Sequence, residues 1–189
     1  MSLKNLSKQA FATALEQMVQ TKPIEKIRVT HLSKVVGTTP QTFYYHFQDK
    51  YDLIAWIYLQ DYIDIVKNHA EHFSPQQIVL MMAKFESRKT FYQKAFTDKS
   101  QNAIETYANQ HSITIAKKAV EQSQQAPLTT QQKIAIIYHQ YGVTGLFIDW
   151  IFNRSDMDIQ QLAEFQYQQA PDFLKEALKN FLYEDYKDN

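Results

Sequence analysis

Apolar residues recur along this chain with the spacing of helices. The first such stripe consists of Phe11, Ala14, Leu15, Met18 and Val19. These positions fall at i, i+3, i+4, i+7 and i+8, which is one face of an α-helix, and the helix is expected to end near Pro23 because proline disfavours helix at the residue before it. Alternation with a period of two is nowhere sustained for the length of a strand. The pattern therefore predicts an all-α protein.

Two short helices separated by a sharp turn are expected next, within residues 30–46. Thr30 is expected to cap the first of them, and Gly37 to end it, because glycine adopts the left-handed conformation at little cost. Thr39 can cap the second helix, and Pro40 suits its first position. This is the layout of a helix-turn-helix, whose second helix enters the major groove of DNA.

The rest of the chain is expected to form helices at 49–72, 75–88, 88–96, 100–124 and 134–152, followed by a segment after residue 158 that Pro171 divides. Ser74 with Gln77 and Thr129 with Gln132 have the spacing of capping boxes. The helix over 134–152 is apolar on nearly all sides, so we expect it to be covered on all sides.

Composition excludes several classes of function. The 189 residues include no cysteine and only three glycines, which removes disulfides, thiolate sites and glycine-rich phosphate loops. No paired catalytic motif occurs, so we expect neither an enzyme nor a bound cofactor. His69 and His72 have no third metal ligand nearby, and no metal site is expected. No apolar run is long enough to span a membrane, which predicts a soluble cytoplasmic protein without a membrane partner.

Charge is distributed unevenly along the chain. The total is zero, but residues 1–56 contain seven Lys or Arg against four Asp or Glu, a net charge of +3 that leaves −3 for the remainder. The N-terminal part is therefore the part that can approach phosphate.

The expected DNA contacts form two groups. The base-reading group at the start of the second short helix is Thr39, Pro40, Gln41 and Thr42. Gln41 offers the donor and acceptor that suit adenine, and the methyl of Thr42 can contact a thymine methyl. The phosphate-contacting group is Tyr44, Tyr45, His46 and Lys50. Ordinary core packing is the alternative for this aromatic cluster, but residues 44–46 cannot all share the helix face of Phe43 and Phe47.

The run Gly37-x-Thr39-x-x-Thr42-Phe43-Tyr44-Tyr45-His46-Phe47-x-x-Lys50-x-x-Leu53 resembles the TetR family of transcriptional regulators over residues 5–56. The resemblance implies an Ω-shaped homodimer with three-helix DNA-binding heads, and usually ligand-controlled release from DNA, as in a repressor. The phosphate-contacting roles of the family then fall on Thr30, Tyr44, Tyr45, His46 and Lys50. Many relatives resemble Ser-x-Gly-Thr where this chain has Thr39 to Thr42, so Gln41 adds a side chain where the backbone often approaches DNA closely.

The C-terminal half has a second set of candidate residues, which the resemblance interprets as a dimer interface. Residues 131–153 and 171–185 look like the two helices that form a four-helix bundle with those of a second copy, although packing within one chain is the alternative. The candidate interface residues are Gly142, Gly145, Phe147, Trp150, Phe173, Leu174, Leu178 and Phe181. The sequence Tyr-Gly-x-x-Gly-x-x-x-x-Trp-Ile is similar to the branch labelled dihydroxyacetone kinase regulators.

These patterns predict a DNA-binding domain at 1–50 and a helical dimerisation and regulatory domain at 51–189. The protein is expected to bind a near-palindromic operator in double-stranded DNA as a homodimer. Four aromatic residues can line an effector pocket, namely Phe85, Tyr107, Tyr138 and Tyr141. Core packing of these aromatics, or a protein co-regulator acting on the same domain, is the alternative. The runner-up function is a helical protein-interaction module without specific DNA binding.

Overall fold

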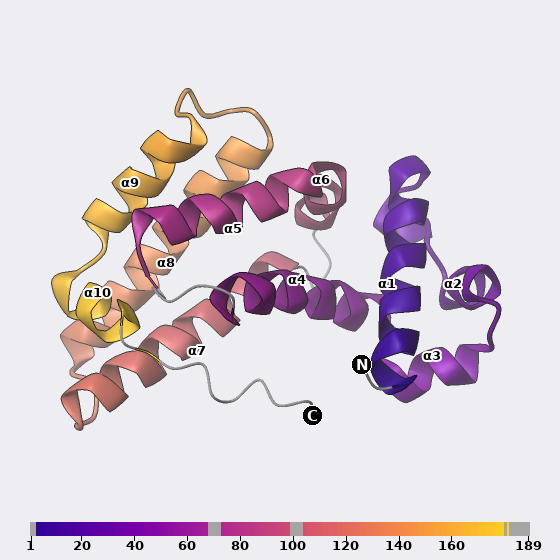
Figure 1. Cartoon of the computed structure of the whole chain (residues 1–189), viewed down its shortest axis with the longest axis horizontal. Helices are drawn as coiled ribbons and strands as arrows, with labels where there is room; N and C mark the ends of the chain where they lie inside the picture. Colours follow the sequence, from indigo (N-terminus) through magenta and orange to yellow (C-terminus); the bar gives the residue numbers. More distant parts are fainter. Residues whose placement is uncertain (1–2, 68–72, 99–103, 180, 182–189) are drawn as a thin grey trace. The chain divides into compact units, whose positions relative to one another are not determined.

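The computed structural model describes residues 3–67, 73–98, 104–179 and 181. In chain order the elements are α1 (Leu3–Thr21), the 3-10 helix η1 (Ile24–Lys26), α2 (Val29–Val36), α3 (Pro40–His46), α4 (Lys50–Lys67), α5 (Pro75–Ser87), α6 (Lys89–Thr97), α7 (Ile104–Gln124), α8 (Thr130–Ile151), α9 (Ile159–Gln169) and α10 (Asp172–Lys179) (Figure 1). No strand occurs among the described residues, and the predicted all-α fold class is confirmed. His69 and His72 lie outside these residues.

The chain forms two compact units. Unit 1 comprises Met1–Leu59 and Arg88–Tyr107, and unit 2 comprises Gln60–Ser87 and Ala108–Asn189. Unit 1 therefore contains the helix-turn-helix together with α6. No helix in the described part of the chain combines the length and apolar character that a membrane crossing needs.

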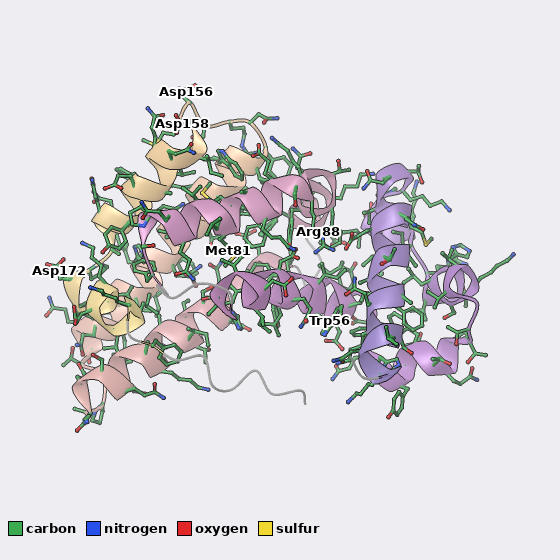
Figure 2. The ribbon with its side chains drawn as sticks, viewed as in Figure 1. Trp56, Met81, Arg88, Asp156, Asp158 and Asp172 are labelled. Carbon is green, nitrogen blue, oxygen red and sulfur yellow. The ribbon has the colours of Figure 1, made fainter. Side chains whose placement is uncertain are left out.

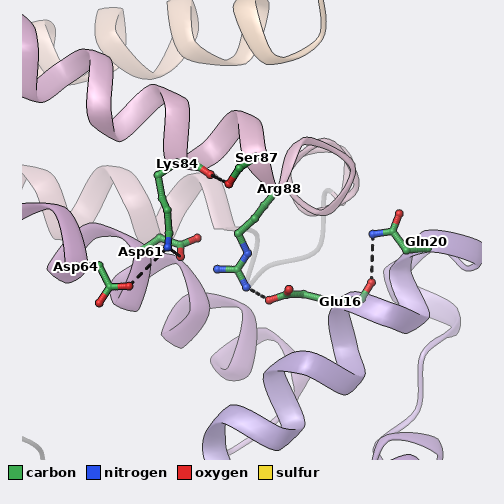
Figure 3. Close-up of polar contacts among 7 residues, drawn as sticks. All are labelled: Glu16, Gln20, Asp61, Asp64, Lys84, Ser87 and Arg88. Atoms are coloured by element: carbon green, nitrogen blue, oxygen red, sulfur yellow. Dashed lines mark hydrogen bonds and ion pairs between the residues drawn. The ribbon is translucent and has the colours of Figure 1, made fainter.

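The core of unit 1 is built on the predicted apolar face of α1. Phe11, Leu15 and Val19 are fully buried, and the Phe11 ring meets the Phe43 ring of α3 edge-on at 5.1 Å between centroids. α1 also contacts α2 and α6. Where α6 begins, Arg88 forms an ion pair with Glu16 of α1 (Figure 3). α1 is thus the element on which the other helices of unit 1 are assembled.

The turn between α2 and α3 follows the predicted local chemistry. Gly37 ends α2 with a φ of 75°, a left-handed conformation that favours glycine. The Thr42 backbone N–H donates to Thr39 Oγ1 at 3.4 Å, and Pro40 occupies the first turn of α3. The predicted cap at Thr30 is wrong. Arg28 occupies the cap position two residues earlier and α2 begins at Val29, because the N–H groups of His31 and Leu32 both donate to the carbonyl of Arg28.

Unit 2 is held together by α5 against α9 and by a cluster between α7, α8 and α10. The buried members of that cluster are Ala116, Ala119, Val120, Leu128, Ile136, Leu174, Ala177 and Phe181. Phe85 of α5 packs on Phe147 of α8 with 5.2 Å between ring centroids. Lys84 Nζ lies 3.6 Å from the buried carboxylate of Asp61 and 3.6 Å from the exposed carboxylate of Asp64 (Figure 3). The carboxylate that unit 2 buries at Asp61 is therefore paired with a cation of α5.

The helix starts in unit 2 follow the capping predictions in different degrees. Thr129 and Gln132 form both halves of the expected capping box. At α5 only one half forms: Ser74 Oγ accepts from the Gln77 N–H at 3.2 Å, while the buried Gln77 side-chain amide has no hydrogen-bond partner among the described residues. α8 is also not covered on all sides in the single chain, because Ile134, Tyr138 and Tyr141 are exposed.

Candidate nucleic-acid interface

The recognition candidate α3 divides its aromatic residues between two faces. Phe43 and Phe47 are 0% and 3% exposed, whereas Tyr44 and Tyr45 are 59% and 75% exposed. The division agrees with the helical spacing of these residues. Two phenol groups therefore project from unit 1 beside a helix that is anchored by its phenylalanines.

The first turn of α3 presents the residues predicted to read bases. Thr39 and Gln41 are exposed, and Pro40 and Thr42 are half-buried. The hydroxyls of Thr39 and Thr42 lie 3.3 Å apart and hydrogen-bond to each other, so they are already partly used within the cap. Among the described residues the Gln41 amide makes no hydrogen bond, and its donor and acceptor remain available to a base.

His46, the last residue of α3, is half-buried among aromatic rings. Its ring lies 6.5 Å from that of Phe11 and 4.9 Å from that of Tyr45, measured between centroids. Burial lowers the pKa of His46, and the positive charges of Lys8 and Lys4 lower it further. Its Nδ1 is buried without a hydrogen-bond partner in the described part of the chain. An imidazole in this setting is neutral at pH 7 and can reach a phosphate only through Nε2.

Lys50 has a different environment from the one its predicted role suggests. Its Nζ donates to the carbonyls of Ile24, Glu25 and Ile27 at 2.7, 3.1 and 3.1 Å. An ammonium group has three N–H donors, so these carbonyls can use all of them. Burial lowers the pKa of Lys50, opposed by the nearby carboxylates of Asp98, Glu25 and Asp49. In this conformation Lys50 ties the start of α4 to η1.

Two lysines of α1, Lys4 and Lys8, lie near the C-terminal end of α3, and neither is among the DNA contacts predicted from the sequence. Lys8 Nζ lies 5.9 Å from the centroids of both the Phe47 and the Trp56 ring; Trp56 lies on α4 where that helix approaches α1 (Figure 2). Lys4 is exposed one turn earlier on α1. Lysines are common on the polar faces of helices, so the sequence contains no signal that marks these two. Only the packing of α1 against α3 reveals that they lie beside the proposed recognition helix.

The remaining predicted DNA contact, Thr30, is exposed on α2.

The candidate dimer residues fall into two sets. Gly142 and Gly145 are exposed, and a Cβ added to either would meet no atom within 4 Å. The other six pack within unit 2. Phe147 contacts Trp150 with 6.1 Å between ring centroids, Leu174 and Phe181 belong to the buried cluster, and Phe173 and Leu178 pack against it.

The four aromatic residues proposed for an effector pocket have unlike environments. Phe85 is buried in unit 2, and Tyr107 meets Tyr58 edge-on within unit 1 at 6.2 Å between ring centroids. Tyr138 and Tyr141 are 81% and 59% exposed on α8. In the single chain the two α8 tyrosines therefore face solvent.

Comparison with a curated protein finds similarity in part of the chain. The HTH-type dhaKLM operon transcriptional activator DhaS of Lactococcus lactis subsp. lactis (strain IL1403) is 24% identical over 92 residues, which are 48% of this chain and 49% of that protein. The chain thus spans about half the length of the curated relative it matches.

Solved structures and family models extend the comparison. A structure of the dihydroxyacetone kinase operon activator DhaS has a TM-score of 0.59 and 18% identity, and the alignment covers 93% of this chain and 97% of that one. At this identity the match demonstrates a shared fold. The family model for the TetR-type transcriptional regulator C-terminal region matches residues 74–172. Since the match covers more than half of the 189 residues, the protein belongs to the TetR family of transcriptional regulators.

Proposed function

We propose that the protein regulates transcription by binding a near-palindromic operator in double-stranded DNA as a homodimer. The observation that carries the proposal is the geometry of α3. The exposed Gln41 lies in its first turn, two exposed tyrosines follow, and both of its phenylalanines face the core. A helix in the major groove contacts base edges with its N-terminal residues and phosphates with residues farther along. Residues 1–50 are the proposed DNA-binding domain, and 51–189 the dimerisation and regulatory domain.

The proposed dimer surface is the exposed face of α8. Ile134, Tyr138, Tyr141 and Gly145 follow one another at i, i+4, i+7 and i+11, which places them on one side of the helix. Large exposed apolar residues in one stripe are typical of an interaction surface, and glycines allow two helices to approach closely. We therefore assign Tyr138 and Tyr141 to the dimer surface rather than to an effector pocket.

The proposed target is an operon for dihydroxyacetone kinase, because the similar solved structure is a dihydroxyacetone kinase operon activator and the curated relative, also called DhaS, is an activator of the dhaKLM operon. A regulator of genomic DNA would act in the cytoplasm.

The family resemblance favours repression, whereas the relatives are named activators. Transcription in vitro from such a promoter distinguishes the two, because adding the protein reduces the transcript in one case and increases it in the other.

Control by an effector is proposed to act on unit 2. Support comes from a polar cluster between α7 and α8. Thr144 donates to Asn109 Oδ1 at 2.7 Å, and Gln140 Nε2 donates to Thr144 Oγ1 at 3.0 Å. A few polar groups in an otherwise apolar interior are typical of small-molecule sites. Dihydroxyacetone is the first probe to test: a rise in the unfolding temperature that Thr144→Val abolishes would support the site.

Fluorescence anisotropy with labelled DNA tests the main proposal. The promoter of a dihydroxyacetone kinase operon and operators selected from random DNA are the specific fragments, and scrambled DNA of equal length is the control, all at one stated salt concentration. Specific binding should exceed binding to scrambled DNA by about 10³-fold or more. Gln41→Ala should relax preference at one base pair by about 1–3 kcal/mol without changing affinity for scrambled DNA.

Two results would contradict this proposal. If no fragment is bound more than about tenfold better than scrambled DNA, far below the usual specificity ratio, the helical protein-interaction module becomes the better account. If Gln41→Ala leaves the preference at every base pair unchanged, Gln41 does not read a base.

A further inference from the structure

The positive charge beside α3 comes from the N-terminal end of α1. Lys4 and Lys8 are four residues apart and therefore share one face of α1. Figure 1 shows that this end of α1 lies against α3. Lys8 Nζ is 5.9 Å from the centroid of Phe47, the residue at which α3 ends. Both charges also lie close enough to His46 to lower its pKa.

Neither lysine is neutralised by a carboxylate in the part of the chain that the structure describes. The Lys8 ammonium instead lies over the faces of two aromatic rings, those of Phe47 and Trp56. Lys50 provides the contrast. Three carbonyls accept from its Nζ, and burial lowers its pKa although nearby carboxylates partly oppose that effect. Lys50 is therefore engaged internally, while the α1 lysines keep their charge available.

Their position fits the edge of a DNA groove. α3 has seven residues and is about 10 Å long, close to the width of the major groove, about 12 Å. If the first turn of α3 meets base edges, its last turn lies near the sugar-phosphate backbone that borders the groove. Lys4 and Lys8 stand at this last turn, and phosphate is the ligand that unpaired lysines bind as point charges.

We propose that Lys4 and Lys8 of α1 contact backbone phosphates of the operator and form, with Tyr45, the phosphate-binding side of the interface. This inference rests on the proposed function, because it concerns how the same DNA is held. The aromatic rings of Phe47 and Trp56 hold Lys8 in place. The ligand is the DNA backbone, so the contact is independent of base sequence.

The dependence of DNA affinity on salt tests the contact. Each phosphate contact contributes about −0.9 to the slope of log K against log salt concentration. Lys8→Met keeps the aliphatic stem on the two rings but removes the charge. The slope should become shallower by about 0.9 for each head, or about 1.8 for a dimer. The advantage of the wild type over Lys8→Met should then be about tenfold larger at 50 mM than at 200 mM salt.

Matched variants separate this contact from other effects. Lys22→Met makes the same change just past the other end of α1, about 20 Å away, and should leave the slope unchanged. Lys4→Met changes an exposed residue without a core contact. This variant should therefore fold normally, and its salt slope should be shallower than that of the wild type. Lys8→Arg should restore the wild-type slope.

The outcomes are distinguishable. Wild-type slopes for Lys4→Met and for folded Lys8→Met, in a protein that binds its operator, would overturn the inference while leaving the proposed function intact. If Lys8→Met fails to fold, the slope of Lys4→Met decides. A wild-type protein without salt-dependent DNA binding would instead refute the proposed function itself.

Discussion

Substituting Gly145 with glutamate should dissociate the proposed homodimer and leave the fold of the single chain intact. Gly145 lies inside α8, is exposed, and has no atom within 4 Å of the place where a Cβ would stand. Replacing glycine inside a helix with a better helix former stabilises it by about 0.5–1 kcal/mol. The isolated chain should therefore be as stable as before or slightly more so.

In the proposed dimer the same side chain would become a buried charge. Gly145 lies one turn from the exposed Tyr141 and two turns from the exposed Tyr138, so the carboxylate would enter an apolar contact. Removing an unpaired charge from water costs several kcal/mol, and two-fold symmetry places two copies in one interface. Taking about 3 kcal/mol per copy, the dissociation constant should rise by about 10⁴-fold.

Sedimentation velocity at micromolar concentration measures the result. The wild type should sediment as a dimer and Gly145→Glu as a monomer with unchanged helix content by circular dichroism. Gln122→Glu adds the same charge at an exposed position of α7 and should remain dimeric. A Gly145→Glu protein that still sediments as a dimer, with a dissociation constant within tenfold of the wild type, would place the interface elsewhere.

Two further predictions concern groups whose surroundings the structure defines. Lys50→Met removes three hydrogen bonds to carbonyls and should lower the free energy of unfolding by about 2–4 kcal/mol; denaturation measures this, and a shallower salt slope of DNA binding in the folded variant would show that Lys50 contacts phosphate after all. Burial lowers the pKa of His111 to about 4 from 6.5, so the unfolded chain takes up this proton first as pH falls. This contribution to stability is complete above pH 6.5 and is lost as the pH falls from about 6.5 to about 4; by pH 5 the loss is about 2 kcal/mol. His139, whose pKa is also lowered by burial and by Lys175, acts in the same direction. Urea denaturation at pH 8 and pH 5 should show a smaller difference for His111→Gln than for the wild type, and equal differences would refute the assignment.

Helices and turns could be predicted from sequence where neighbouring residues determine them. Thr39 caps α3 through a bond to a residue three positions away, and Gly37 takes a conformation that its lack of a Cβ permits. Such signals are complete within a few residues. The predicted cap at Thr30 failed because Arg28 starts α2 through its backbone carbonyl, without a side-chain hydrogen bond. Backbone capping of this kind has no characteristic residue type.

The environments of the site residues depend on contacts that sequence spacing does not reveal. Lys50 binds carbonyls 23 to 26 residues earlier in the chain, and Lys8 is placed by rings of α3 and α4. A periodic apolar pattern also cannot distinguish residues that face the core from residues that face an interface, because both kinds of surface exclude water. The sequence pattern of Tyr138 is therefore equally consistent with a pocket lining and with an interface, and only the structure reveals that its side chain is 81% exposed in the single chain.

The partners of individual cations explain how a chain of zero net charge can bind a polyanion. Arg88 is paired with Glu16, and Lys84 with Asp61 (Figure 3), so these cations add little positive potential beyond their own neighbourhood. What attracts DNA is the set of cations without an internal partner, and net charge averages over both kinds. Removing a paired cation should therefore change stability more than the salt dependence of DNA binding. Removing an unpaired one such as Lys8 should do the reverse.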